Sequence, residues 1–178
     1  RDELSTQAKR EALRLNPGLA WAKNDLGYQL LESGGDFEEA ARLIEEAYTA
    51  LPNEPSIIDS IGWIRYHQGV LVDQPASGDR PMVEGAVTLL KKAVETGTGK
   101  KNGTLHDHLA ESLWAAGNRD EAKEVWTKAE ALLSEDVNLL KDSSTTPAAA
   151  LTRANKELDG VRGKRRAAAE GTEPILTP

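Results

Sequence analysis

The sequence predicts an all-α fold in which pairs of helices stack side by side. The chain has 178 residues and is rich in Ala, Leu, Glu and Lys, which favour helices. Three windows repeat one skeleton of aliphatic, small and glycine positions, and this self-similarity indicates structural repeats. Each window carries two Ala residues seven positions apart, which places both on one face of a helix. A single helix pair could not bury its apolar stripe alone, so the repeats must stack.

The composition narrows the class of protein. The chain has 22 Lys and Arg against 29 Asp and Glu, a formal charge of −7 at pH 7. This negative charge disfavours a protein that binds nucleic-acid phosphates. Cysteine is absent, which excludes disulfides, thiol catalysis and Cys-based zinc sites and leaves the compartment open. No window approaches the roughly 18 apolar residues of a membrane span, so we expect a soluble chain.

Residues 1–18 are expected to form the second helix of an incomplete preceding repeat. The residues that match the end of such a helix are Ala12, Leu13, Leu15 and Pro17. Arg1 is not an initiator methionine, and no charged-then-apolar signal segment follows it. We therefore expect the chain to begin inside a longer array, with any targeting signal outside the visible sequence.

The first complete repeat is expected at residues 19–54. Its skeleton consists of Leu26, Gly27, Leu30, Gly34, Gly35, Ala40, Leu43, Ile44, Ala47 and Pro52. The glycine pair marks a turn between two helices. Asp36 and Glu39 follow it at capping-box spacing, so the second helix is expected to begin there.

The second repeat, residues 55–102, contains an insertion. Its skeleton consists of Ile61, Gly62, Gly69, Ala86, Leu89, Leu90 and Ala93. Its small residue and its last Ala are 31 positions apart, against 20 and 19 in the other two windows, so a loop is expected at residues 71–85. Pro75, Gly78 and Pro81 prevent a continuous helix there. The loop either has a binding role or is simply tolerated, because added loop length costs little free energy.

The third repeat is expected at residues 103–136. Its skeleton consists of Leu109, Ala110, Leu113, Gly117, Ala122, Val125, Trp126 and Ala129. Asn118 and Glu121 again have capping-box spacing, and Trp126 is expected in the core. The small residues Gly27, Gly62 and Ala110 allow the two helices of each pair to approach closely.

A linker and a capping helix are expected at residues 137–170, followed by an extended tail at 171–178. Residues 142–146 are a polar break, with Thr146 as the N-cap and Pro147 in the first helical turn. One apolar stripe at helical spacing then consists of Leu151, Ala154, Leu158 and Val161. A helix with one apolar stripe is suited to covering the end of a solenoid, although Gly160 and Gly163 weaken its far end. We expect the basic run at Lys164, Arg165 and Arg166 to be solvated rather than to bind acidic partners.

This pattern resembles the tetratricopeptide repeat (TPR) family, whose unit is a 34-residue helix-turn-helix. The resemblance covers roughly residues 19–134. The early Trp position of the family is held by Lys23, Ile58 and His106, and the closing Pro is missing from the second and third repeats. The resemblance implies a right-handed solenoid whose first helices line a concave groove that holds a partner segment.

The resemblance also assigns residues to that partner-binding groove. They are Trp21, Asn24, Tyr28, Leu31, Asp59, Trp63, Tyr66, His67, Asp107, Glu111 and Trp114. Trp63, Tyr66 and Trp114 are the expected aromatic anchors, because such side chains offer large contact area with few rotors to freeze. The alternative is that these aromatic residues pack between adjacent repeats.

The charge of the expected groove limits its partners. Asp59, Asp107 and Glu111 have no Lys or Arg at equivalent positions, which argues against the TPR subgroup that grips a C-terminal carboxylate. By complementarity the partner segment is expected to be basic or apolar. The alternative is an acidic face exposed only to solvent.

No pattern in the sequence indicates a catalytic, cofactor or metal site. His106 and His108, two positions apart, point to opposite sides of a helix, and His108 with Glu111 supplies only two ligands. Gly97–Lys101 contains a GxGK fragment without the phosphate-loop spacing and is expected to be a turn. We therefore expect a non-catalytic protein-interaction scaffold without cofactor or metal.

Two alternative functions remain open at the sequence level. The repeats could be a structural or self-associating segment of a longer solenoid, since Leu13 and Leu15 lack a partner helix. They could also be the accessory repeat region of a larger enzyme.

Overall fold

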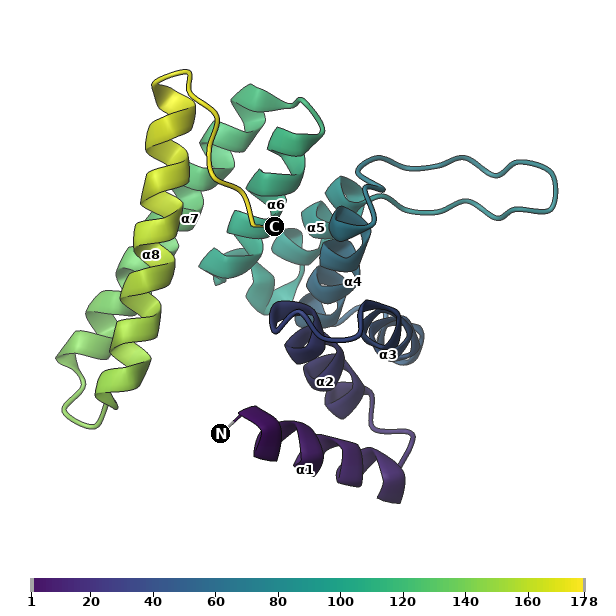
Figure 1. Cartoon of the computed structure of the whole chain (residues 1–178). Coiled ribbons are helices and arrows are strands. Elements are labelled where there is room, and N and C mark those ends of the chain that lie inside the picture. Colours follow the sequence, from purple (N-terminus) through teal and green to yellow (C-terminus); the bar gives the residue numbers. More distant parts are fainter. Residues whose placement is uncertain (1, 178) are drawn as a thin grey trace.

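The protein is all-helical over the part of the chain that the structure describes. The computed structural model describes residues 2–177, and Figure 1 shows their helices following one another along a curved path. The elements are α1 (Asp2–Leu15), α2 (Ala20–Glu32), α3 (Phe37–Ala50), α4 (Pro55–His67), α5 (Ala86–Glu95), the 3-10 turn η1 (Gly97–Lys101), α6 (Gly103–Ala115), α7 (Arg119–Asp142) and α8 (Ala148–Ala169). Within residues 2–177 no helix is long and apolar enough to cross a membrane.

Consecutive helices pair closely at the predicted small residues. A Cβ atom added to Gly27 on α2 would lie 2.7 Å from Ile44 Cγ1 on α3, and one added to Gly62 on α4 would lie 2.8 Å from Leu90 Cγ on α5. Ala110 on α6 is fully buried. Larger side chains at these positions would push the helices apart, which explains the small residue in each repeat.

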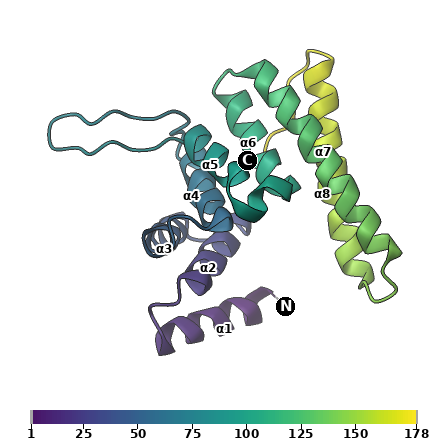
Figure 2. The ribbon, with the colours of Figure 1, turned by 180° about the vertical axis from the view of Figure 1, so that it is seen from behind.

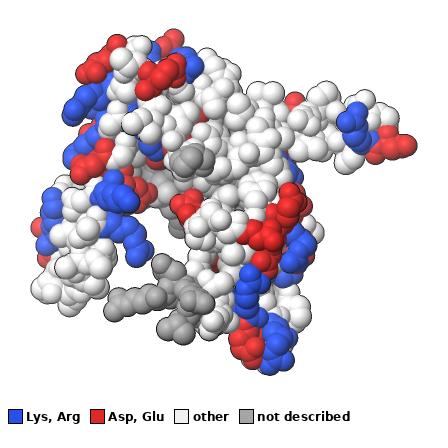
Figure 3. All heavy atoms as spheres, in the orientation of Figure 1, with Lys and Arg blue, Asp and Glu red and all other residues white. Residues whose placement is uncertain are grey.

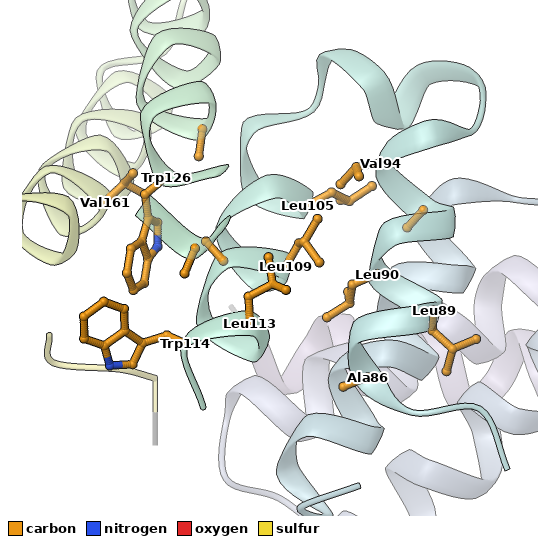
Figure 4. Packing of buried hydrophobic residues seen from close by; sticks show 14 of the residues in the cluster. Ala86, Leu89, Leu90, Val94, Leu105, Leu109, Leu113, Trp114, Trp126 and Val161 are labelled. Atoms are coloured by element: carbon orange, nitrogen blue, oxygen red, sulfur yellow. The ribbon is translucent and has the colours of Figure 1, made fainter. Parts of the chain in front are cut away.

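The paired Ala residues lie in the core, five of them in one continuous cluster and Ala47 in a small cluster with Ala20 and Ile57. All six are completely buried: Ala40, Ala47, Ala86, Ala93, Ala122 and Ala129. Figure 4 shows the same core continuing from Leu90 on α5 through Leu109 on α6 to Trp126 on α7 and Val161 on α8. Trp126 is therefore in the core, as the sequence predicts.

The N-terminal ends of the helices match the predicted N-caps only in part. Asp36 caps α3 as predicted, because its Oδ1 accepts a hydrogen bond from the Glu39 N–H at 3.0 Å. Asn118 precedes α7, but its side chain makes no capping bond. The prediction of Thr146 as N-cap is wrong by one residue: the extended Pro147 holds that position and α8 starts at Ala148.

The first of the last two helices is longer than predicted, and the second is unbroken. α7 continues to Asp142, so residues 137–142 are helical and do not belong to a linker. α8 passes through Gly160 and Gly163 without a break. Buried residues on both helices, Val137 on α7 and Val161 on α8 among them, explain this, because the mutual packing outweighs the low helix propensity of glycine.

The insertion is a hairpin that projects away from the helices (Figures 1 and 2). Gln74 and Val83 exchange backbone hydrogen bonds of 2.8 and 2.9 Å, and Gly78 at the tip has a positive φ of 59°. At its base the Asp73 carboxylate accepts a hydrogen bond from the Gly85 N–H at 2.8 Å. The loop is thus ordered by its own contacts and leaves the α4–α5 pair intact.

Candidate partner-binding groove

The inner face of the solenoid is formed by α2, α4 and α6, the first helix of each repeat. At its centre Trp63 stacks between Tyr66 and His108, with ring centroids 4.5 and 4.1 Å apart and interplanar angles of 6° and 14°. Trp63 is completely buried. The expectation that Trp63 anchors a partner from the surface is therefore corrected: its ring is already covered on both faces by the protein's own side chains.

His108 is held in this stack by Asp59. Its Nδ1 lies 3.0 Å from both carboxylate oxygens, and both residues are buried. Burial by itself lowers the pKa of His108, but the negative charges of Asp59, Asp107 and Glu111 outweigh it and raise that pKa to about 9. At neutral pH a charged imidazolium thus lies against the Trp63 ring, where a cation is favoured.

Lys164 from α8 forms ion pairs with the other two groove acids. Its Nζ lies 2.6 Å from Asp107 Oδ2 and 2.5 Å from Glu111 Oε1, and the Trp126 indole N–H donates to Asp107 at 2.8 Å. Burial raises the pKa of Asp107 and is opposed by Lys164. The expectation of acidic side chains that select a basic partner is corrected, because Asp59, Asp107 and Glu111 are buried and paired inside the protein. The expectation of a solvated basic run is corrected at Lys164 for the same reason.

A segment after α8, residues 172–177, crosses the α6 end of the inner face, and we call it the tail (Figure 1). The Trp114 indole N–H donates to Glu173 at 2.8 Å, and Arg119 lies 3.2 Å from the same carboxylate. The Thr177 N–H and hydroxyl both donate to Glu111 at 2.8 Å. Trp114 is therefore also buried. We call the part of the inner face under the tail, which includes Glu111, Trp114 and Arg119, the covered groove.

The other end of the inner face is open. A cavity of about 390 Å³ lies between α1, α2, α4 and the start of α6, and we call it the open groove. Its lining residues include Lys9, Asn24, Tyr28, Ser56, Asp59, Ser60, Asn102 and Thr104. Figure 3 shows the surface hollowed between α8 and the α1–α2 end of the molecule.

Asn24 is the most informative residue of the open groove. Its side chain is 5% exposed, and its Oδ1 accepts no hydrogen bond from any residue that the structure describes. Buried polar atoms usually have a partner, so an acceptor without one is a candidate contact for a ligand. Tyr28 lies one turn further along α2, and burial, then the Asp59 charge, keep its pKa above the ordinary value.

Trp21 shares this face of α2 and is half exposed, at 49%. The three tryptophans assigned to the groove therefore differ: Trp21 is accessible, whereas Trp63 and Trp114 are buried. His67 lies edge-on against Trp63 and Tyr66, and burial lowers its pKa. Leu31 is half-buried against the core.

Several residues at the groove were missed in the sequence because they lie outside the first helices. Lys164 contacts Glu111, which is 53 positions earlier in the chain, and Glu173 contacts Trp114, which is 59 positions earlier. One feature of the sequence could have indicated Lys164. Three acidic residues, Asp59, Asp107 and Glu111, map to one face, and if that face is buried each carboxylate requires a positive charge from another part of the chain. Among the described residues, no cluster of three or more His, Asp or Glu side chains is placed to hold a metal ion.

Comparisons with known proteins agree with this architecture. No protein-family model matches the chain. A curated TPR repeat-containing protein of Pseudomonas aeruginosa is 40% identical over 75 residues, which are 41% of this chain and 13% of that protein. Two crystal structures of the protein MamA align with 95% and 99% of this chain and cover 87% and 89% of theirs, each with a TM-score of 0.56 and 13% identity.

These matches and the fold define a helical repeat protein. The 75-residue match to a TPR repeat-containing protein supports the resemblance to that family seen in the sequence. The MamA structures, at 13% identity, establish the fold alone. The chain spans only 13% of the length of the curated relative, so the match concerns the repeats rather than that whole protein.

Proposed function

We propose that the protein is a non-catalytic interaction scaffold whose open groove binds an extended segment of a partner protein. The observation that carries this proposal is the buried, unpartnered Oδ1 of Asn24 at the open groove, one turn from the exposed Trp21 ring. An extended segment presents backbone N–H groups that can donate hydrogen bonds to the Asn24 carboxamide oxygen. The polar side chains that line the cavity can donate hydrogen bonds to the carbonyl groups of the segment.

The partner segment is proposed to be apolar where it meets Trp21. A half-exposed indole offers a large contact area at low entropic cost. Selection by acidic groove residues is not part of the proposal, because Asp59, Asp107 and Glu111 already have partners inside the protein.

Affinity capture from a lysate of the source cells tests this function. The variant Trp21→Ala/Asn24→Ala removes the proposed contacts, and Leu139→Ala, at a residue of α7 that is 64% exposed, is the matched control. We expect partners that bind the parent and the control to be lost, by about tenfold or more, with the double variant. Circular dichroism must first show that all three chains are folded. Equal capture by all three would contradict the proposal.

Self-association is a second candidate, favoured by one observation. Leu15 on α1 is 70% exposed and Leu19 is 40% exposed, so the α1 end presents apolar surface. Sedimentation as a function of concentration tests it with Leu15→Ser, which is expected to abolish any dimer. A concentration-independent monomer for the parent would exclude this candidate.

A further inference from the structure

The tail lies on the covered groove in the way a bound peptide would. It is extended, follows the end of α8 and contacts side chains of α6 and α7 rather than continuing a helix. The Glu173 carboxylate, a buried Pro174, the Leu176 side chain packed on the core and the polar groups of Thr177 each meet a different feature of this surface. The covered groove therefore recognises both side chains and backbone of an extended segment.

The buried charge of the covered groove has a partner besides the tail. Glu111 pairs with Lys164 at 2.5 Å as well as accepting from Thr177, so its carboxylate does not depend on the tail alone. The Arg119 guanidinium lies 4.0 Å from the centre of the Trp114 ring and holds that side chain in place. Loss of the tail would therefore leave no buried carboxylate unpaired, and the Trp114 indole N–H would be free for the carboxylate of another segment.

The tail is buried at one residue, Pro174, half-buried at Leu176 and Thr177, and exposed between these points. Gly171, which joins it to α8, has a positive φ of 74°, and a Cβ atom added there would meet no other atom within 4 Å. Ile175 is 91% exposed. A cavity of about 420 Å³ separates the tail from α8 and is lined by Gly160, Gly163 and Ala167 among others. Few buried apolar contacts are typical of segments that detach at low free-energy cost.

We propose that the covered groove is a second partner-binding site, occupied in cis by the tail, for an extended segment of the tail's own chemistry. That segment carries an acidic residue, a proline next to it, an aliphatic residue two positions later and then a hydroxyl residue. The carboxylate binds the Trp114 indole and Arg119, and the hydroxyl residue binds Glu111. This inference extends the proposed function along the inner face and rests on it for the existence of a partner.

The tail then acts as a built-in competitor. A short tether holds it near its site at an effective concentration of the order of 1 mM. For a segment whose intrinsic Kd is about 0.1 mM, such a competitor weakens apparent binding by about tenfold. Release of the tail is expected to restore that affinity.

A fluorescent peptide with the sequence of residues 171–178, blocked at both ends, is the probe. Its anisotropy is titrated with the full chain, with the tail-release variants Glu173→Lys and Leu176→Asp, and with the control Ile175→Lys, whose parent side chain is exposed. We expect the release variants to bind the peptide about tenfold more tightly than the parent and the control. Trp114→Phe, added to a release variant, should weaken binding about tenfold because the indole N–H is lost.

Two results would overturn the proposal. One is equal affinity of the peptide for parent and release variants, and the other is no binding to release variants that circular dichroism shows to be folded. Neither depends on the open groove: Asn24→Ala in a release variant is expected to leave peptide binding unchanged. Failure of this second site is thus distinguishable from failure of the capture experiment with Trp21→Ala/Asn24→Ala.

Discussion

At the scale of single residues, charges buried under the inner face decide its structure. His108 lies on Trp63 and is paired with Asp59, and Lys164 bridges Asp107 and Glu111. Each of these groups would be costly to bury alone, so each depends on its partner. This arrangement leads to two predictions about stability.

The first prediction concerns the pH dependence of the free energy of unfolding. The pKa of His108 is about 9 in the fold against 6.5 for an ordinary His, so the folded state holds the proton more tightly. The resulting stabilisation is complete below pH 6.5 and is lost as the pH rises through 9. We expect the free energy of unfolding, measured with urea, to fall by about 2–3 kcal/mol between pH 6.5 and 9.5. His108→Gln should remove most of this fall, whereas His67→Gln should keep it. A parent profile that stays flat over that interval would refute the assignment.

The second concerns the charge bridge from α8. Lys164→Met leaves two buried carboxylates without their counter-charge, and we expect the free energy of unfolding to fall by about 3–5 kcal/mol. Lys156→Met, at an exposed position of the same helix, should change it by less than about 0.5 kcal/mol. Chemical denaturation of both variants is the measurement. Similar stability for the two would show that Lys164 is not required.

The burial of a residue was predictable from the sequence where the residue belongs to the repeated pattern. Ala93 and Ala129 are buried because they recur at a helical spacing that needs no knowledge of other elements. The exposure of Trp21, Trp63 and Trp114 was not predictable in this way. Trp114 is covered by Glu173, which belongs to no repeat, and Trp63 is covered by His108 from the next repeat.

At the scale of elements, helix pairing is governed by the small residues and helix ends by packing. α7 passes the end of the third repeat because Val137 is buried against its neighbours, and no local signal near Ser134 reveals this. The glycines of α8 would favour an earlier end, but contacts with α7 hold the helix together to Ala169. Tertiary contacts therefore override local propensity in both helices.

The helix packing can be tested on α7 itself. Ala129→Glu places a charge at a fully buried position between helices, and we expect a loss of at least about 4 kcal/mol or complete unfolding. Ala131→Glu, two positions along the same helix and exposed, is expected to be neutral within about 0.5 kcal/mol. Thermal melts compare the two. Equal melting temperatures would mean that the repeat alignment is wrong.

The hairpin of residues 71–85 can be shortened as an independent element. Replacing residues 75–82 by a Gly-Asn turn keeps the Asp73–Gly85 bond at its base. Because the removed part is mainly exposed, we expect the free energy of unfolding to change by less than about 1 kcal/mol. If partner capture persists, the loop is a tolerated insertion. If capture is lost while the fold remains, the loop has the binding role.

At the scale of the whole molecule, the repeats form one inner face with two different ends. The α6 end is covered by α8 and the tail, and the α1–α2 end is open (Figures 1 and 3). The repeat in the sequence predicts the solenoid, and the resemblance to the TPR family predicts which helices line its groove. The sequence also predicts a capping helix at the C-terminal end, but not that this helix and the tail place Lys164 and Glu173 against the inner face.

Photo-crosslinking from the groove tests the central claim most directly. The photoreactive residue p-benzoylphenylalanine replaces Trp21 in one chain and Leu139, exposed on α7, in another, and crosslinked partners are mapped by mass spectrometry. A partner segment bound in the open groove predicts crosslinks from position 21 to one short stretch of a partner, and none from position 139. Crosslinks to the same proteins from both positions, or from position 139 alone, would contradict a groove-binding scaffold.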